Sequence, residues 1–179
     1  VGSEMCIRDR EKKMRSSFPE SGSRDLSTVE ETYAFGEELG AALEAGDVVI
    51  LDGPLGAGKT TLTQGVAKGM QVKGRVTSPT FVIARVHRST VGGPDLVHVD
   101  AYRLLDEGGA NSGDPLGELD ALDLDTELED AVVIAEWGGG LVEQIAEHYL
   151  FISIDREPAE YAGADEDVRR FTWSLRGGH

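Results

Sequence analysis

Residues 48–61, VVILDGPLGAGKTT, constrain the fold of this chain more than any other stretch. Four apolar residues, three of them β-branched, predict a short buried strand that ends at Leu51. A glycine-rich turn follows, and then a polar run that can open a helix. The fixed positions of the phosphate-loop pattern G-x-x-x-x-G-K-[ST] are all present, at Gly53, Gly58, Lys59 and Thr60.

The spacing of this motif follows from the chemistry of phosphate binding. Successive backbone N–H groups of such a loop form a nest for phosphate oxygens, and the positive end of the following helix adds to the field. Glycines permit a close backbone approach that a Cβ would block. Lys59 is expected to reach the β- and γ-phosphates, and the Thr60 hydroxyl is expected to ligate Mg²⁺. Four further residues complete the expected nucleotide contacts: Leu55, Gly56, Ala57 and Thr61.

Length and composition fit one α/β domain with enough residues for a hydrophobic core. We expect a P-loop NTPase-like domain over residues 27–176, with a mixed, mostly parallel sheet, antiparallel edge strands and flanking helices. Residues 1–10, VGSEMCIRDR, look like the translation of a sequencing-library adapter and are set aside as an artefact. Residues 11–26 carry no periodicity and are expected to form a disordered lead-in.

Hydrophobic periodicity and turn residues predict the individual elements. A capping box at Ser27 and Glu30 opens a helix that is expected to run through Ala45. Further helices are expected at 60–68 and 141–148, with one or two short ones between 104 and 130. The expected strands are 47–51, 96–100, 131–135, 149–154 and, at an edge, 170–175, with 76–87 pairing to 96–100 as a hairpin. Gly65 inside a helix predicts a close packing contact.

Charge and composition exclude several classes of function. The formal net charge is −16, so the chain repels a nucleic-acid backbone, and tight unaided binding to nucleic acid is not expected. Cys6, the only cysteine, lies in the segment set aside, which leaves no thiolate nucleophile or cysteine-based metal site. No apolar run approaches the length of a membrane span, and no signal peptide is visible. We therefore expect a cytoplasmic protein without membrane contact.

Two apolar strands end in a carboxylate, as a Mg²⁺ site beside a phosphate loop requires. LVHV precedes Asp100 and VVIA precedes Glu136, and a strand that ends at the carboxyl edge brings its carboxylate to the phosphate crevice. Mg²⁺ takes one or two carboxylates together with phosphate oxygens, so both residues fit the site. Thr80, in SPTF, is placed as a switch threonine that senses the γ-phosphate.

Four motifs follow one another in a fixed order: GPLGAGKTT, SPTF, HVDAYRL and AEW. Together they resemble the bacterial TsaE (YjeE) family, the P-loop ATPases of tRNA threonylcarbamoyladenosine (t6A) synthesis. The likeness covers roughly residues 27–154. It implies that Lys59 and Thr60 bind phosphate and Mg²⁺ and that Thr80 belongs to a switch segment. It also implies that Asp100 and Glu136 are site carboxylates, with Glu136 the first choice for the metal or water contact, and that Trp137 lies beside the nucleotide.

The resemblance further implies an ATPase that is weak alone and is stimulated by a partner. Such a protein would bind ATP and Mg²⁺, dock on a TsaB–TsaD complex that carries out t6A modification, and reset that complex by hydrolysis. Any contact with tRNA would come through the complex. Two alternatives stay open: a small-molecule or nucleoside kinase, and a nucleotide-gated interaction module with negligible turnover. A GTPase is disfavoured because no Asn-Lys-x-Asp motif occurs.

Some residues depart from the family pattern or from a site. The family usually has aspartate after the first glycine of the loop, whereas Pro54 here removes a backbone donor. Beyond residue 154 the match is loose, and Arg169 and Arg170 are expected to be solvated surface rather than nucleotide contacts. His87 and His98 lack metal-ligand spacing and are expected to be structural or exposed.

Overall fold

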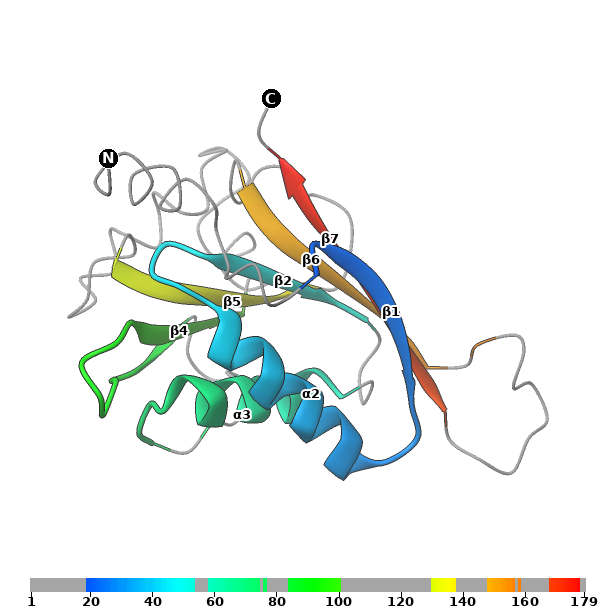
Figure 1. The fold of residues 1–179 in the computed structure, drawn as a ribbon, viewed down its shortest axis with the longest axis horizontal. Helices are drawn as coiled ribbons and strands as arrows, with labels where there is room; N and C mark the ends of the chain where they lie inside the picture. The colour runs from blue at the N-terminus through cyan, green and yellow to red at the C-terminus, as the bar shows by residue number, and fades with distance from the viewer. Residues whose placement is uncertain are drawn as a thin grey trace, which may run out of the picture.

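A computed structural model describes residues 19–53, 58–74, 76, 84–100, 130–137, 148–156, 158 and 168–177, with only the backbone for residues 100, 137 and 177. Seven strands form one sheet in the order β1-β7-β6-β2-β5-β4-β3 (Figure 1). The strands are β1 Ser21–Leu26, β2 Val48–Asp52, β3 Ala84–His87, β4 Asp95–Asp100, β5 Ala131–Trp137, β6 His148–Asp155 and β7 Arg169–Gly177. The described helices are α2 Val29–Ala42 and α3 Lys59–Met70.

The four central strands are parallel, and antiparallel strands extend the sheet on both sides. β6, β2, β5 and β4 pair in parallel. β7 and β1 add antiparallel strands beyond β6, and β3 adds one beyond β4. This architecture confirms the predicted mixed α/β fold, and the β3–β4 pairing confirms the predicted hairpin.

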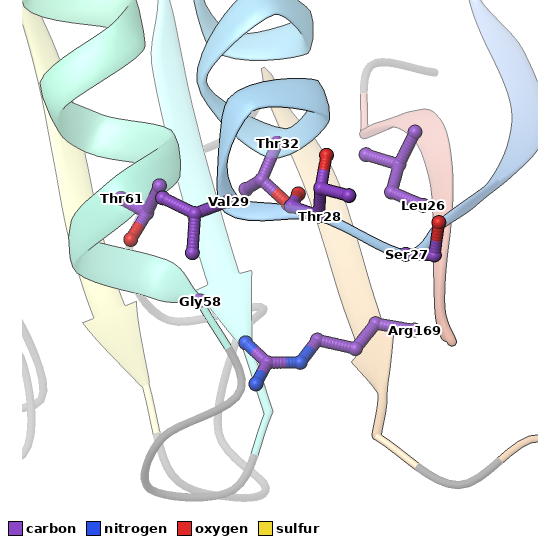
Figure 2. Close-up of a pocket in the computed structure, with 8 residues that line it drawn as sticks. All are labelled: Leu26, Ser27, Thr28, Val29, Thr32, Gly58, Thr61 and Arg169. Atoms are coloured by element: carbon purple, nitrogen blue, oxygen red, sulfur yellow. The ribbon is translucent and has the colours of Figure 1, made fainter. Parts of the chain in front are cut away.

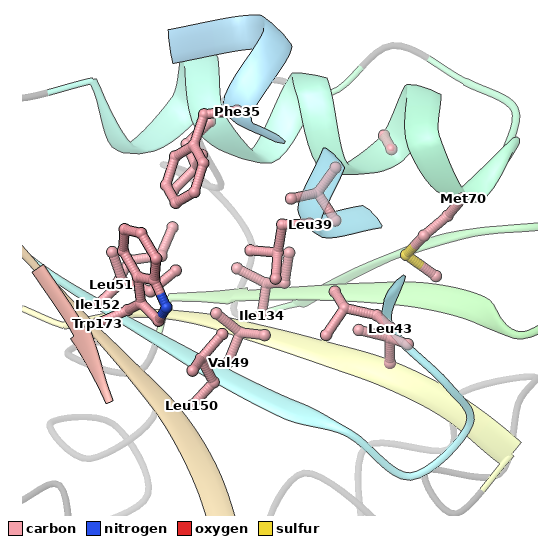
Figure 3. Packing of buried hydrophobic residues seen from close by; sticks show 14 of the residues in the cluster. Phe35, Leu39, Leu43, Val49, Leu51, Met70, Ile134, Leu150, Ile152 and Trp173 are labelled. Carbon is pink, nitrogen blue, oxygen red and sulfur yellow. The ribbon is translucent and has the colours of Figure 1, made fainter. Parts of the chain in front are cut away.

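Both helices pack on one face of the sheet, and their contact with it forms the hydrophobic core (Figures 1 and 3). Alternate residues of the central strands point toward the helices because side chains alternate between the two faces of a strand. Val49 and Leu51 of β2 meet Phe35 and Leu39 of α2 in this cluster. Ile50, between them, is also fully buried, which explains why the strand reads as an unbroken apolar run.

α2 and α3 approach each other closely through glycines. A Cβ on Gly36 would overlap the carbonyl oxygen of Leu62, and a Cβ on Gly65 would overlap that of Tyr33. The Cα atoms of Gly36 and Gly65 face each other across the contact. The close packing predicted at Gly65 is therefore confirmed, and small residues on both helices allow it.

β1 corrects the prediction that residues 11–26 are disordered, since residues 21–26 form a strand that pairs with β7. Only Leu26 in this strand is a large apolar residue, so hydrophobic periodicity gives no signal for it. Its stability comes from distant partners instead: Arg170 contacts Asp25 in two hydrogen bonds of 2.8 and 3.1 Å. The expectation that residues 170–175 lie at an edge is also wrong, because β1 is the edge strand.

The bounds of α2 differ from the predicted ones at both ends. Thr28, not Ser27, is the N-cap, and its hydroxyl accepts a hydrogen bond from the Glu31 N–H at 3.1 Å. A capping box has Ser or Thr at the N-cap and Glu three residues later. Both Ser27 and Thr28 fit this pattern, so the sequence alone does not identify the N-cap. Leu43 is the C-cap with an extended backbone, so the helix stops before the predicted Ala45.

Several predicted segments fall outside the described residues. The short helices expected between 104 and 130 lie there, as does the helix at 141–148 except for His148, which begins β6. The adapter assignment of residues 1–10 is likewise untested. Neither described helix has the length and apolar composition that crossing a membrane requires.

We predict that Gly65→Ala lowers the free energy of unfolding by at least ~1 kcal/mol, because the overlap with the Tyr33 carbonyl outweighs the better helix propensity of alanine. Urea unfolding at equilibrium measures the change. Gly93→Ala is the matched control, since its Cβ would lie an ordinary 3.6 Å from Ser89 Oγ and should bring no loss. Equal stability of the two variants would contradict the helix contact.

A second prediction concerns His87, which is buried at the end of β3. Burial lowers the pKa of His87, although a 3.3 Å hydrogen bond to the Lys73 carbonyl partly opposes this shift. A lowered pKa in the folded state means that the unfolded chain binds the proton more readily. The stabilisation is therefore complete above the unfolded pKa of about 6.5 and is lost as the pH falls.

Urea unfolding between pH 7.5 and 5.5 should show a loss of stability in the unsubstituted chain that is smaller in His87→Asn. The difference between the two slopes is at most about 1.4 kcal/mol per pH unit, the value for one proton. Parallel slopes would show that His87 does not contribute to this pH dependence.

Candidate nucleotide-binding site

The phosphate-loop motif joins the carboxyl end of β2 to the start of α3, as its sequence context predicts. Gly58 is the N-cap of α3, with φ 109° and ψ 13°. This left-handed conformation is strained for a residue with a Cβ, which explains the second glycine of the motif. β2 has parallel neighbours on both sides, so the loop lies at the carboxyl edge where ligands bind in open α/β sheets.

Lys59 and Thr60 occupy the first turn of α3, at the end of the loop. Lys59 Nζ donates a 2.9 Å hydrogen bond to the Gly53 carbonyl, which links the two ends of the motif. The N-cap residue, Gly58, has no side chain to cap this helix start, and the first turn of α3 contains no acidic residue. Because the first backbone N–H groups of a helix have no partner within it, this end of α3 fits an anion.

The two predicted carboxylate positions lie side by side at the same edge. Asp100 pairs with Glu136 in the β4–β5 register, and Glu136 pairs with Leu51 of β2. The Glu136 side chain is 13% exposed, so its carboxylate is partly withdrawn from water. The structure therefore places Glu136 next to β2, the strand that leads into the phosphate loop, and Asp100 one strand further along the same edge.

His98 is a site neighbour that the sequence alone did not identify. Its ring is fully buried in β4, and Nε2 lies 3.0 Å from Glu136 Oε1. The burial of His98 confirms the expectation that it is structural or exposed in favour of a structural role. Its contact with Glu136, a predicted site residue, was not expected from the sequence. The sequence does contain one indication that His98 lies near the site: it precedes Asp100 by two residues, and residues two apart lie on the same face of a strand.

Gly58 also borders a pocket, which lies between the end of β1, the start of α2 and the start of β7 (Figure 2). Its eight lining residues are Leu26, Ser27, Thr28, Val29, Thr32, Gly58, Thr61 and Arg169. Arg169 extends from β7 toward Gly58, and a Cβ on Gly58 would lie 3.3 Å from its guanidinium. Arg169 is thus half-buried at this pocket, and whether it contacts a nucleotide stays open, whereas Arg170 forms an ion pair with Asp25.

The oxygen donors that the structure places at this edge suit Mg²⁺. A Thr60 hydroxyl and a Glu136 carboxylate are hard ligands of the kind that Mg²⁺ prefers, with Asp100 at the adjacent strand position. Within the described ranges, three or more metal-ligating side chains do not cluster. A Mg²⁺ ion here would accordingly need phosphate oxygens and water to complete its shell.

Other predicted site residues lie outside the described part of the chain. These are Leu55, Gly56 and Ala57 of the loop, Thr80 of the switch segment, and the side chains of Asp100 and Trp137. The roles predicted for them stay predictions. Thr61 is described, and its place in the pocket lining agrees with a position beside the loop.

Comparison with known proteins relates most of the chain to one family. The family model of "Threonylcarbamoyl adenosine biosynthesis protein TsaE" matches residues 26–164. The tRNA threonylcarbamoyladenosine biosynthesis protein TsaE of Mycobacterium tuberculosis H37Rv is 51% identical over 166 residues, which cover 92% of this chain and 94% of that protein. The TsaE protein of Streptomyces coelicolor is 53% identical over 137 residues, which cover 76% and 85%.

A solved structure supports the same relationship. The crystal structure of YdiB from Bacillus subtilis superposes with a TM-score of 0.61 at 27% identity, covering 93% of this chain and 89% of that one. The described sheet, the two ends of the phosphate loop and the strand positions of Glu136 and Asp100 agree with the motifs on which the resemblance is based. The chain belongs to the TsaE family of threonylcarbamoyl adenosine biosynthesis proteins.

Proposed function

We propose that this chain is a Mg²⁺-dependent ATPase that acts as an accessory factor in t6A modification of tRNA. One observation carries the proposal: in a member of the TsaE family, β2 leads into the phosphate loop whose two ends are joined by the Lys59–Gly53 bond, and the same strand pairs with Glu136 at its carboxyl end. The relatives are named as t6A biosynthesis proteins, which supports the pathway. The loop supports a nucleoside triphosphate as the ligand.

The side chains at this edge have distinct tasks in the proposed reaction. Lys59, now bonded to the Gly53 carbonyl, would exchange that acceptor for phosphate oxygens. Thr60, Glu136 and Asp100 would hold Mg²⁺, which when bound neutralises phosphate charge and orients the transferring group. His98 holds the Glu136 carboxylate in place. Positioning and electrostatics would thus supply most of the rate of attack by water.

The general base and the switch are further parts of this proposal. Either Glu136 or Asp100, which are partners in the strand register, would orient the attacking water, and the choice between them stays open. Thr80 would order against the γ-phosphate and form part of a surface that docks on a TsaB–TsaD complex. Hydrolysis would release that segment and reset the complex.

The charge of the chain supports an indirect role in RNA modification. With a net charge of −16, it would approach tRNA through the complex rather than by direct binding. We place this activity in the cytoplasm. The kinase and the nucleotide-gated module remain the alternatives, and turnover experiments separate them from the ATPase.

Lys59→Ala should weaken ATP binding at least ~10-fold, because the variant loses the ammonium group that pairs with the phosphates. Titration calorimetry with Mg²⁺ and ATP measures the affinity. Lys68→Ala is the matched control, since Lys68 lies in the same helix but pairs with Glu37 at the surface. If Lys59→Ala bound ATP as the unsubstituted chain does, the proposed site would be wrong.

Phosphate release from ATP should be slow for the chain alone and faster with a TsaB–TsaD complex. Glu136→Gln should keep ATP binding but lose the stimulated turnover, because the amide replaces a carboxylate at the proposed metal site. A parallel screen of phosphate acceptors tests the kinase. Acceptor phosphorylation would support that alternative, and binding without turnover in any condition would support the gated module.

A further inference from the structure

Positive charge in this acidic chain is concentrated in one stretch of the sequence. Residues 53–99 contain six of the 17 lysines and arginines but only one of the 33 acidic residues, Asp95. One of these bases, Lys59, belongs to the phosphate loop, and the other five lie outside every motif of the sequence. In a chain of net charge −16, such a basic stretch indicates a surface that meets a negatively charged partner.

The fold gathers the described part of this stretch around the end of α3. The segment that follows α3 runs beside the β3–β4 hairpin, because the Lys73 N–H donates a 2.8 Å hydrogen bond to the Arg88 carbonyl and Val72 bridges Ser89. His87 of β3 lies against the same segment, with Nδ1 3.3 Å from the Lys73 carbonyl. The end of α3, this segment and the hairpin therefore form one surface, at the opposite end of the sheet from β1 (Figure 1).

A groove of about 420 Å³ lies in this surface. Its walls include Tyr33 of α2, Ala67 and Lys68 of α3, and Val72 and Val76 of the following segment. The floor is apolar, since Ala67 and Val76 are buried and Val72 packs against the hydrophobic core. An apolar side chain brought from outside would lose its contact with water in such a groove, which favours its binding there.

The rim of the groove carries positive charge that the chain neutralises only in part. Lys68 pairs with Glu37 at 3.3 Å, but its side chain is 63% exposed. Lys73 is exposed between two lining residues, and the described part of the chain gives its ammonium group no ion pair. On the neighbouring β3, Arg85 Nε is buried without a hydrogen-bond partner. Because a charge withdrawn from water is costly without a partner, these cations favour a carboxylate supplied from outside.

We propose that this groove docks a segment of a partner protein that carries an acidic side chain next to an apolar one. The apolar side chain lies on the floor beside Val72 and Val76, and the carboxylate pairs with Lys73. A protein segment fits better than RNA, because the floor is apolar and the cations Lys68 and Arg88 already pair with acidic residues. A second copy fits less well, since two chains of net charge −16 repel each other.

The inference rests on the proposed function, since the partner used to test it is the proposed TsaB–TsaD complex. It adds a docking surface that is separate from the phosphate loop. Lys59 begins α3, whereas the groove lies around the end of that helix. With 12 residues and a rise of about 1.5 Å per residue, the two ends of α3 are roughly 18 Å apart. Substitutions at the groove can therefore change docking without changing nucleotide binding.

Biolayer interferometry of the full chain with a TsaB–TsaD complex, in the presence of Mg²⁺ and ATP, tests the surface. Lys73→Glu should weaken this binding at least ~10-fold, because it sets two like charges against each other. Tyr33→Ala should weaken it about threefold or more by removing apolar wall. Arg176→Glu is the matched control, since it makes the same change of charge at an exposed residue of β7. Titration calorimetry should find the ATP affinity of all three variants within about twofold of the unsubstituted chain.

Each other outcome overturns the assignment. Equal losses in Lys73→Glu and Arg176→Glu would reduce the effect to net charge, and full affinity in Lys73→Glu would remove the groove from the interface. A loss of ATP affinity in Lys73→Glu would place its effect at the phosphate loop. If Lys73→Glu instead lost binding to tRNA, or self-association in sedimentation, the surface would belong to RNA or to a second copy. If the unsubstituted chain did not bind the complex, the proposed partner would be wrong, and this inference would fail with it.

Discussion

The close contact between α2 and α3 is the constraint on which the site depends. Gly36 and Gly65 let the two helix backbones meet, so both helices fit on one face of the sheet. The start of α3 carries the end of the phosphate loop, and the start of α2 forms a wall of the pocket beside it. A side chain at either glycine would separate the helices and move these two parts of the site apart.

The carboxylate side of the site depends on strand register rather than on helix packing. Parallel pairing of β5 with β2 and β4 sets Glu136 beside Leu51 and Asp100. The buried His98 ring then constrains the Glu136 carboxylate through a 3.0 Å contact. Groups held in this way need little rearrangement when charge develops near them, which is the property that electrostatic catalysis requires.

The sequence predicted the features that are encoded locally. The phosphate loop, the central strands and the tight packing at Gly65 each have a signal within a few residues. β1 and Arg169 had no such signal, because Asp25 and its partner Arg170 are 145 residues apart, and the position of Arg169 follows only from the sheet order. The link between His98 and Glu136 likewise depends on a strand register that periodicity does not specify.

The glycine contacts also show that α2 and α3 run in the same direction, since later residues of one helix meet later residues of the other. Both positive dipole ends therefore face the same edge of the sheet. α2 neutralises its own end with the Thr28 cap and with Glu30 and Glu31 in its first turn, whereas the N-cap of α3, Gly58, has no side chain and the first turn of α3 has no acidic residue. In a chain of net charge −16, this asymmetry leaves one helix end as a local attractor for anions.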